Sequence, residues 1–266
     1  MIPSDIRLQI MQRLARTEQE HGVRIVLAIE SGSRAWGFAS LNSDFDVRFI
    51  YVRPADWYLA VDLEERRDVI EYAITDDIDL NGWDLRKALR LFWKSNPAFV
   101  EWLQSPIKYI EVGNFAAQAR ELLPSIYSQE SGIYHYRSMA KTNYRGYLRA
   151  ETVPLKKYFY VLRPLLSVRW IERYGCAAPI EFGKLLHLIE DQPQLFSDIQ
   201  TLLFKKQNAP ELGLAEPVTS INDFIQKELD RLEIINSQHT QRSHPLEQLN
   251  ALFKATVHEA QVQFNL

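Results

Sequence analysis

The sequence predicts an α+β protein in which a small mixed sheet with helices is followed by an all-helical C-terminal half. Strand-like runs are concentrated before residue 113, and helical periodicity with Tyr, Arg and Lys takes over from about residue 114. We therefore expect a first domain over residues 1–113 and a helical domain over residues 114–266.

The first half begins with alternating helices and strands. Ile6, Ile10 and Leu14 share one side of a predicted helix, and the run that follows is β-branched and mostly apolar, as in a buried strand. Pro54 ends the second strand, and Asp84 stands at an N-cap position. The predicted helices cover residues 6–20, 31–39, 85–94 and 97–103, and the predicted strands cover residues 23–29, 45–52, 69–74 and 78–83.

The second half reads as a series of helices. Its periodicity predicts helices at residues 115–123, 133–149, 155–174, 180–190, 195–206 and 221–236, with another after His244-Pro245. Residues 207–219 contain Pro210, Gly213 and Pro217 and form a predicted loop. Pro164 predicts a kink or a break within the third of these helices.

Composition excludes several classes of protein. The single cysteine, Cys176, excludes an intramolecular disulfide and a thiolate metal site, and 46% hydrophobic residues support a sizeable core. A net charge of −3 indicates no global attraction to nucleic acid, although local basic patches remain compatible with it. No apolar run approaches the ~18 residues of a membrane span, and no signal-peptide pattern is present. We therefore expect a cytoplasmic protein without a membrane partner.

The residues best suited to catalysis and metal binding are concentrated in one motif. Residues 30–37 read E-S-G-S-R-A-W-G, and ten residues separate Ser33 from the pair Asp44 and Asp46. Alternate residues of a strand share a face, so the two carboxylates would lie side by side and favour a divalent cation between them. Backbone amides of the Gly-Ser turn suit a phosphate. The motif therefore predicts metal-assisted chemistry on a nucleoside triphosphate.

The pattern G-S-x(10)-D-h-D-h, where h is apolar, resembles the signature of the DNA polymerase beta-type nucleotidyltransferase superfamily. The resemblance implies that residues 1–113 form the catalytic domain. It also implies that Asp44, Asp46 and an acid from a later strand hold two Mg²⁺ ions, with Mn²⁺ as an alternative. Gly32 and Ser33 would contact the nucleotide phosphates. Arg34 is a further candidate for phosphate binding, the alternative being a solvated side chain.

The third acid has four candidates. Asp76 and Asp77 look like turn residues, and Asp84 is explained as a helix cap. Asp79 lies between apolar neighbours and would point away from the apolar face of its strand. We therefore expect Asp79 to be the third catalytic and metal-binding acid.

Further segments narrow the resemblance. G-W-D-L-R-K-A-L-R-L at residues 82–91, N-P at 96–97, E-W-L-Q-S-P at 101–106, M-A-K-T-N-Y at 139–144 and K-Y-F-Y-V-L-R-P at 157–164 look like a bacterial family of predicted nucleotidyltransferases grouped with RNA-repair-pathway polymerases. This match implies that Lys157 and Arg163 bind the nucleotide. Arg48 is a departure from the family pattern, because the corresponding strand position is often apolar in such proteins. Trp36 is expected in the core, and Glu30 is either a partner of the acids or a strand-end charge.

The expected function is Mg²⁺-dependent transfer of a nucleoside monophosphate from a nucleoside triphosphate to a hydroxyl, with release of pyrophosphate. Family grouping favours an RNA or DNA 3′ end as the acceptor. The alternatives are a protein or small-molecule acceptor, or a non-catalytic nucleotide-binding or antitoxin-like partner protein. The sequence predicts neither the base nor the oligomeric state.

Overall fold

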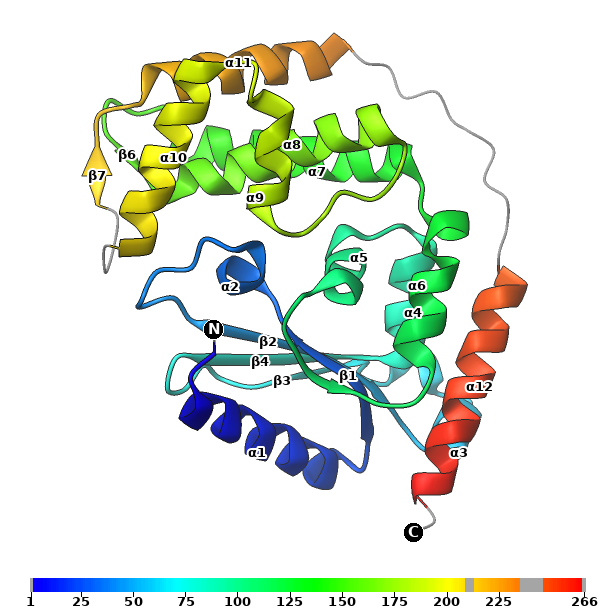
Figure 1. Ribbon diagram of the computed structural model, residues 1–266. Coiled ribbons are helices and arrows are strands. Elements are labelled where there is room, and N and C mark those ends of the chain that lie inside the picture. The colour runs from blue at the N-terminus through cyan, green and yellow to red at the C-terminus, as the bar shows by residue number, and fades with distance from the viewer. Residues whose placement is uncertain (1, 209–212, 235–245, 265–266) are drawn as a thin grey trace.

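The central element is a five-stranded mixed sheet with the strand order β3-β4-β2-β1-β5 (Figure 1). The structure is a computed structural model and describes residues 2–208, 213–234 and 246–264. Strands β2 and β4 run parallel, and the other neighbouring strands are antiparallel. The strands are β1 (Arg24–Glu30), β2 (Phe45–Val52), β3 (Val69–Glu71), β4 (Ile78–Asp84) and β5 (Lys108–Glu111).

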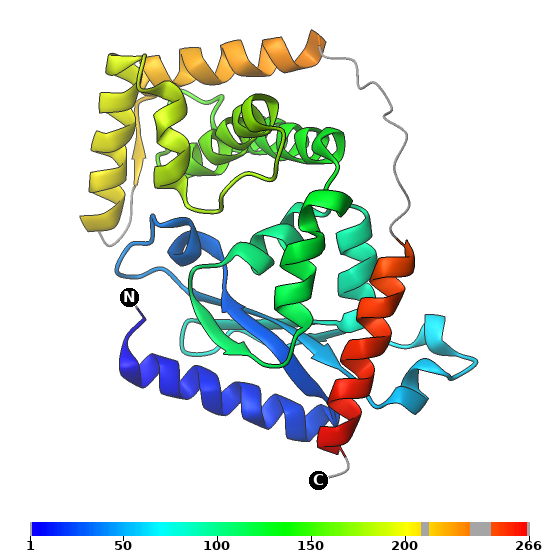
Figure 2. The same ribbon diagram turned by 45° about the vertical axis from the view of Figure 1, so that its right-hand side comes forward.

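Helices cover both faces of this sheet. Helix α1 (Ser4–His21) packs on one face through Ile10 and Leu14, which belong to the same apolar cluster as the strand residues Val47 and Phe49. The opposite face packs against α4 (Leu85–Trp93), α5 (Pro97–Gln104), α6 (Phe115–Ile126) and α12 (Leu246–Phe264) (Figures 1 and 2). The connections contain α2 (Gly32–Trp36), α3 (Ala55–Tyr58) and a 3₁₀ turn (Leu63–Glu65).

The rest of the chain is mainly helical and has its own core. It comprises α7 (Gln129–Tyr147), α8 (Lys157–Tyr174), α9 (Phe182–Leu185), a 3₁₀ turn (Leu186–Ile189), α10 (Pro193–Asn208) and α11 (Thr219–Ile234). Leu162, Leu166 and Ile199 are buried in this core. A two-stranded sheet, β6 (Val153–Pro154) and β7 (Leu214–Ala215), lies beside it. The predicted α+β class with a helical C-terminal part is thus confirmed.

The packing of the helices does not follow the predicted division of the chain into two domains at residue 113. Helices α6 and α12 belong to the expected helical domain by sequence, yet both pack into the core of the sheet. In the other direction, Phe38 follows α2 and enters the helical core, where its ring stacks on Phe159 at 5.0 Å between centroids. The two parts of the chain are therefore interlocked, and the end of α2 is fixed by both.

Several predicted boundaries also change. Helix α8 is continuous through Pro164, so the predicted break is wrong. The strand predicted at 69–74 ends at Glu71, and the helix predicted at 180–190 is two short turns. The end of the helix predicted at 221–236 and the segment His244-Pro245 lie outside the described residues, as does part of the predicted loop 207–219. None of the described helices is long and apolar enough to cross a membrane.

Candidate active site

The predicted acids meet where the parallel strands β2 and β4 begin. Asp46 and Asp79 are direct register partners on these strands. Arg48 lies between their carboxylates, with Nη2 at 3.1 Å from Asp46 Oδ1 and 2.7 Å from Asp79 Oδ2. Asp44 precedes β2 and is exposed. Arg48, which the sequence marked only as a departure, therefore neutralises two of the three expected acids and orients them.

Position 32 requires a glycine because its backbone lies too close to the Asp46 carboxylate to leave room for a side chain. Its φ is +58°, and a Cβ at this position would lie 1.9 Å from Asp46 Oδ2. The amide of Ser31 donates to the Asp46 carbonyl oxygen at 2.8 Å, which ties the turn to the strand. The spacing G-S-x(10)-D-x-D thus brings the start of α2 directly onto the second aspartate.

Glu30 lies beside Asp46 and is completely buried. Its Oε1 accepts the Asp46 amide at 3.0 Å, and its Oε2 accepts the Tyr109 hydroxyl at 2.6 Å. Burial raises the pKa of Glu30 to about 7, against the lowering effect of the Tyr109 hydrogen bond. Burial also raises the pKa of Asp46, an effect that Arg48 opposes and that Asp79 and Asp44 reinforce. Of the two interpretations of Glu30, a partner of the acids or a strand-end charge, the structure supports the first, because Glu30 binds the Asp46 amide.

Arg34 holds the loop that leads into β2. Its Nε donates to the Asp44 carbonyl oxygen at 3.1 Å, and its Nη2 donates to the Ser43 carbonyl oxygen. The guanidinium carbon also lies 3.9 Å from the centroid of the Phe45 ring. In this structure Arg34 therefore shapes the loop that carries Asp44.

A cleft of about 430 Å³ opens above the acids, between the sheet domain and the helical part. Ser33, Asp44 and Asp46 line it from one side, and side chains of α8 and α10 line it from the other. Its remaining lining residues are Ser40, Asn42, Ser43, Lys156, Lys157, Tyr160 and Lys206. This volume lies in the range of small-molecule and cofactor sites.

The lysines give the helical wall of the cleft its positive charge. Lys157 Nζ lies 4.0 Å from the Tyr147 ring centroid and 5.0 Å from that of Tyr160. Lys206 is only 8% exposed, and burial together with the nearby Lys156 lowers its pKa. Sequence reasoning missed Lys206, because nothing in α10 distinguishes it from a solvated lysine. It reaches the cleft because the end of α10 lies against the segment that follows α2, where Gln207 Nε2 donates to the Gly37 carbonyl oxygen at 3.1 Å and Lys206 Nζ lies 5.8 Å from the Phe38 ring centroid.

Arg163 is not brought to the cleft. It is 3% exposed and forms an ion pair with Glu101, at 2.9 and 3.1 Å from the two carboxylate oxygens. Its guanidinium carbon lies 4.2 Å from the centroid of the Trp36 ring. In this structure Arg163 is thus engaged by Glu101 and does not line the cleft, an arrangement that the sequence did not reveal because Glu101 lies far away along the chain.

The carboxylates that line the cleft fit a divalent cation. Asp44 and Asp46 provide the oxygen ligands that Mg²⁺ prefers, and the Gly32 backbone leaves space at Asp46 that a Cβ would fill. Asp79 shares the Arg48 guanidinium with Asp46 and is not among the residues that line the cleft. Within the described ranges, no group of three acidic, histidine or cysteine side chains converges as a metal site. The expected third ligand is thus near the pair but engaged by Arg48.

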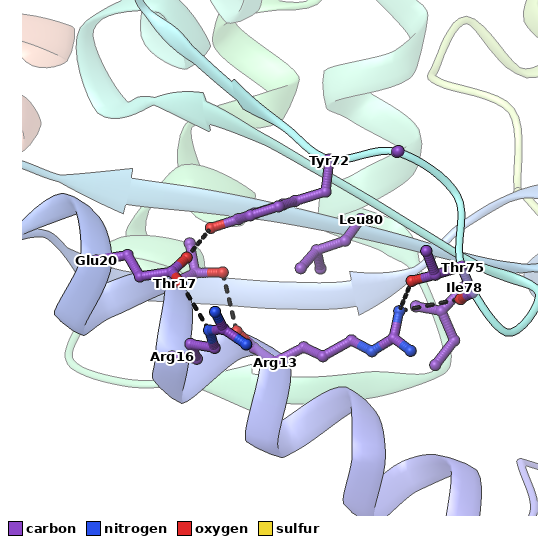
Figure 3. A pocket seen from close by; sticks show the side chains of 9 residues that line it. Arg13, Arg16, Thr17, Glu20, Tyr72, Thr75, Ile78 and Leu80 are labelled. Carbon is purple, nitrogen blue, oxygen red and sulfur yellow. Dashed lines mark hydrogen bonds and ion pairs between the residues drawn. The ribbon is translucent and has the colours of Figure 1, made fainter.

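A second pocket, of about 440 Å³, lies between α1 and the β3–β4 hairpin (Figure 3). Ile78 and Leu80 line it, so it is on the face of β4 opposite to Asp79. Its arginines are engaged locally: Arg13 donates to Thr75, and Arg16 pairs with Glu20 at 2.6 Å. The pocket therefore lacks the carboxylate pair and the lysines that distinguish the cleft.

A Gly-Ser turn that contacts Asp46 of β2, beside Asp79 of β4, is the arrangement expected of a polymerase beta-like nucleotidyltransferase. The chain belongs to the RNA repair pathway DNA polymerase beta family, whose sequence profile matches residues 6–255. It is 44% identical over 255 residues to the uncharacterized protein YcgL of Bacillus subtilis (strain 168), covering 96% of this chain and 97% of that protein.

Among solved structures, the chain is similar to a nucleotidyltransferase-like protein from Exiguobacterium sibiricum 255-15. That match covers 96% of this chain and 90% of the other, at 13% sequence identity and a TM-score of 0.31. A likeness this slight carries no argument about the site.

Proposed function

We propose that the protein is a Mg²⁺-dependent nucleotidyltransferase that moves a nucleoside monophosphate from a nucleoside triphosphate to a hydroxyl acceptor and releases pyrophosphate. The observation that carries the proposal is the cleft, in which Asp44 and Asp46 face Lys156, Lys157 and Lys206. Carboxylates on one wall and ammonium groups on the other suit a triphosphate that arrives with a divalent cation.

In this proposal the residues of the cleft have different roles. Asp44 and Asp46 would hold Mg²⁺ or Mn²⁺, which when bound supplies positive charge at the phosphate under attack. Lys157 and Lys206 would neutralise the charge that develops on the departing pyrophosphate. Ser33 lines the same cleft and would donate a hydrogen bond to a phosphate oxygen. Gly32 contributes by leaving room for the Asp46 carboxylate.

Proton transfer from the acceptor hydroxyl needs no additional base. One of the carboxylates that line the cleft would accept this proton. Arg48 pairs with Asp46 and also holds Asp79 beside it. We propose that Asp79 acts on Asp46 through this shared guanidinium.

Membership of an RNA repair pathway family favours an RNA or DNA 3′ end as the acceptor. Because the net charge of the chain is −3, binding of such an acceptor would depend on local cationic groups, such as those of the cleft. A protein or small-molecule acceptor is the alternative, and a non-catalytic nucleotide-binding partner is the candidate from another class.

The test uses each of the four ribonucleoside triphosphates labelled at the α-phosphate, with Mg²⁺ or Mn²⁺. The acceptors are single-stranded RNA and DNA oligonucleotides with a free 3′ hydroxyl, and matched oligonucleotides ending in a 3′ phosphate. We expect label to appear on the free 3′ ends alone. Label on the protein itself would favour protein modification, and binding of triphosphate without transfer to any acceptor would support the non-catalytic alternative.

A further inference from the structure

Arg163 and Glu101 form a buried ion pair behind the cleft, where four helices meet. Glu101 lies on α5 and Arg163 on α8, and their side chains are 8% and 4% exposed. The Glu101 carboxylate also accepts the Tyr136 hydroxyl of α7 at 3.0 Å and the Trp36 indole nitrogen of α2 at 3.3 Å. One carboxylate therefore connects α2 to three helices outside it.

This arrangement makes Arg163 dependent on Glu101. Arg163 Nη1 is buried and has no hydrogen-bond acceptor within the described part of the chain, so the Glu101 carboxylate is the group that neutralises the guanidinium. Removing one member of such a pair leaves a buried charge uncompensated. The position of the guanidinium, and of the Trp36 ring beneath it, is thus set by the pair.

Helix α2 cannot hold its position by itself. It has five residues, and a single helical turn is unfavourable without tertiary contacts. On the side of the helical part, those contacts come from its last residue: Trp36 lies under Arg163, 5.5 Å from Phe38 and 5.8 Å from Tyr160 between ring centroids. The first residues of the same helix, Gly32 and Ser33, face Asp46 and the cleft. Trp36 therefore anchors α2 from the side of the helical part and helps to set the position of Ser33, three residues earlier on the same turn.

We propose that the Arg163–Glu101 pair positions the triphosphate-binding end of α2, acting through Trp36 and without touching the nucleotide. The assignment rests on the proposed function for the identity of the ligand. It gives Arg163 a role in nucleotide binding that differs from the direct contact expected from the sequence.

The test compares Glu101→Gln and Trp36→Phe with a matched control, Glu228→Gln. Glu101→Gln keeps the shape of the side chain and removes its charge, whereas Trp36→Phe keeps an aromatic ring and removes the indole donor. Glu228 lies on α11 and its side chain is 2% exposed; it pairs with Arg169 of α8 at 2.7 Å and with Arg231 of its own helix at 2.9 Å, away from α2. Two readouts are needed: the dissociation constant of inorganic tripolyphosphate, and hydrogen–deuterium exchange of residues 31–38.

We expect Glu101→Gln to weaken tripolyphosphate binding about tenfold, equivalent to ~1.4 kcal/mol, and Trp36→Phe to weaken it several-fold. Exchange at residues 31–38 should accelerate in both. Glu228→Gln should change neither readout at a temperature where all variants give wild-type near-ultraviolet circular dichroism. Equal effects of Glu101→Gln and Glu228→Gln would overturn the proposal.

The two readouts also separate this proposal from the proposed function. If the wild-type protein fails to bind tripolyphosphate, the proposed function is wrong, and exchange then decides the positioning claim alone. Unchanged exchange at residues 31–38 in Glu101→Gln overturns the positioning claim, whatever the wild-type protein binds.

Discussion

Replacing Gly32 with alanine should damage both stability and cation binding, because it disturbs the backbone and the carboxylate together. The φ of +58° disfavours any residue with a Cβ by about 1–2 kcal/mol. The new Cβ would lie 1.9 Å from Asp46 Oδ2 and 2.7 Å from Cγ, so Asp46 must leave its rotamer. That displacement costs about 0.5–1.5 kcal/mol, and the loss of the Arg48 hydrogen bond costs about 1–3 kcal/mol more.

Gly22 provides a control for the backbone contribution. Its φ is +59°, and a Cβ there would meet nothing within 4 Å. We expect Gly22→Ala to cost about 1 kcal/mol after the loss of unfolded-state entropy is taken into account. Gly32→Ala should cost about 3–5 kcal/mol, which for a chain of this size lowers Tm by roughly 10 °C.

The assay is thermal unfolding of both variants, followed by Mn²⁺ binding measured by electron paramagnetic resonance at a temperature where both are folded. Gly32→Ala should bind Mn²⁺ at least about tenfold more weakly than Gly22→Ala, a difference of ~1.4 kcal/mol. Equal unfolding temperatures together with equal Mn²⁺ affinities would refute the contact between Gly32 and Asp46 as the reason for the glycine.

Three more predictions concern charged groups around the cleft. The pKa of Glu30 is raised from 4.5 to about 7, so between these pH values the folded protein holds a proton that the unfolded chain loses. The free energy of unfolding should therefore fall as pH rises from 4.5 to about 7. In denaturant titrations, Glu30→Gln should remove this pH dependence. Lys206→Met should weaken tripolyphosphate binding about tenfold (~1.4 kcal/mol), whereas Lys205→Met, at the exposed neighbour, should not. Arg48→Gln should destabilise the protein by about 1–3 kcal/mol, and millimolar Mg²⁺ should raise Tm more in this variant than in wild type; an equal shift in both would contradict the role given to Arg48.

The local parts of the site were predictable from sequence because they depend on strand periodicity and short-range turns. The apolar runs around Asp46 and Asp79 located both strands, and their parallel pairing made the two residues register partners. The Gly-Ser turn was found by its spacing alone. The structure supplies the reason for this spacing, namely contact between the Gly32 backbone and the Asp46 carboxylate.

The rest of the site depends on contacts between segments far apart in sequence, which carry no local signal. From the sequence Lys206 looks like a surface lysine, and only the packing of the end of α10 against residues 37–38 brings it to the cleft. Arg163 lies in a segment that resembles the family, but its partner Glu101 is on another helix, so the sequence carries no sign of the buried pair. Helix α12 was assigned to the helical half by order along the chain, whereas its apolar face packs on the sheet domain.

The central claim is that Asp46 and its partners support attack on the α-phosphate of a nucleoside triphosphate. The most direct measurement is label transfer to an oligonucleotide with a free 3′ hydroxyl, using triphosphates labelled at either the α- or the γ-phosphate. We predict transfer of the α-label alone, abolished in Asp46→Asn and in Asp44→Ala, and retained in Asp77→Asn, which changes an exposed aspartate on the turn before β4. Full transfer by folded Asp46→Asn, or transfer of the γ-label, would contradict the account.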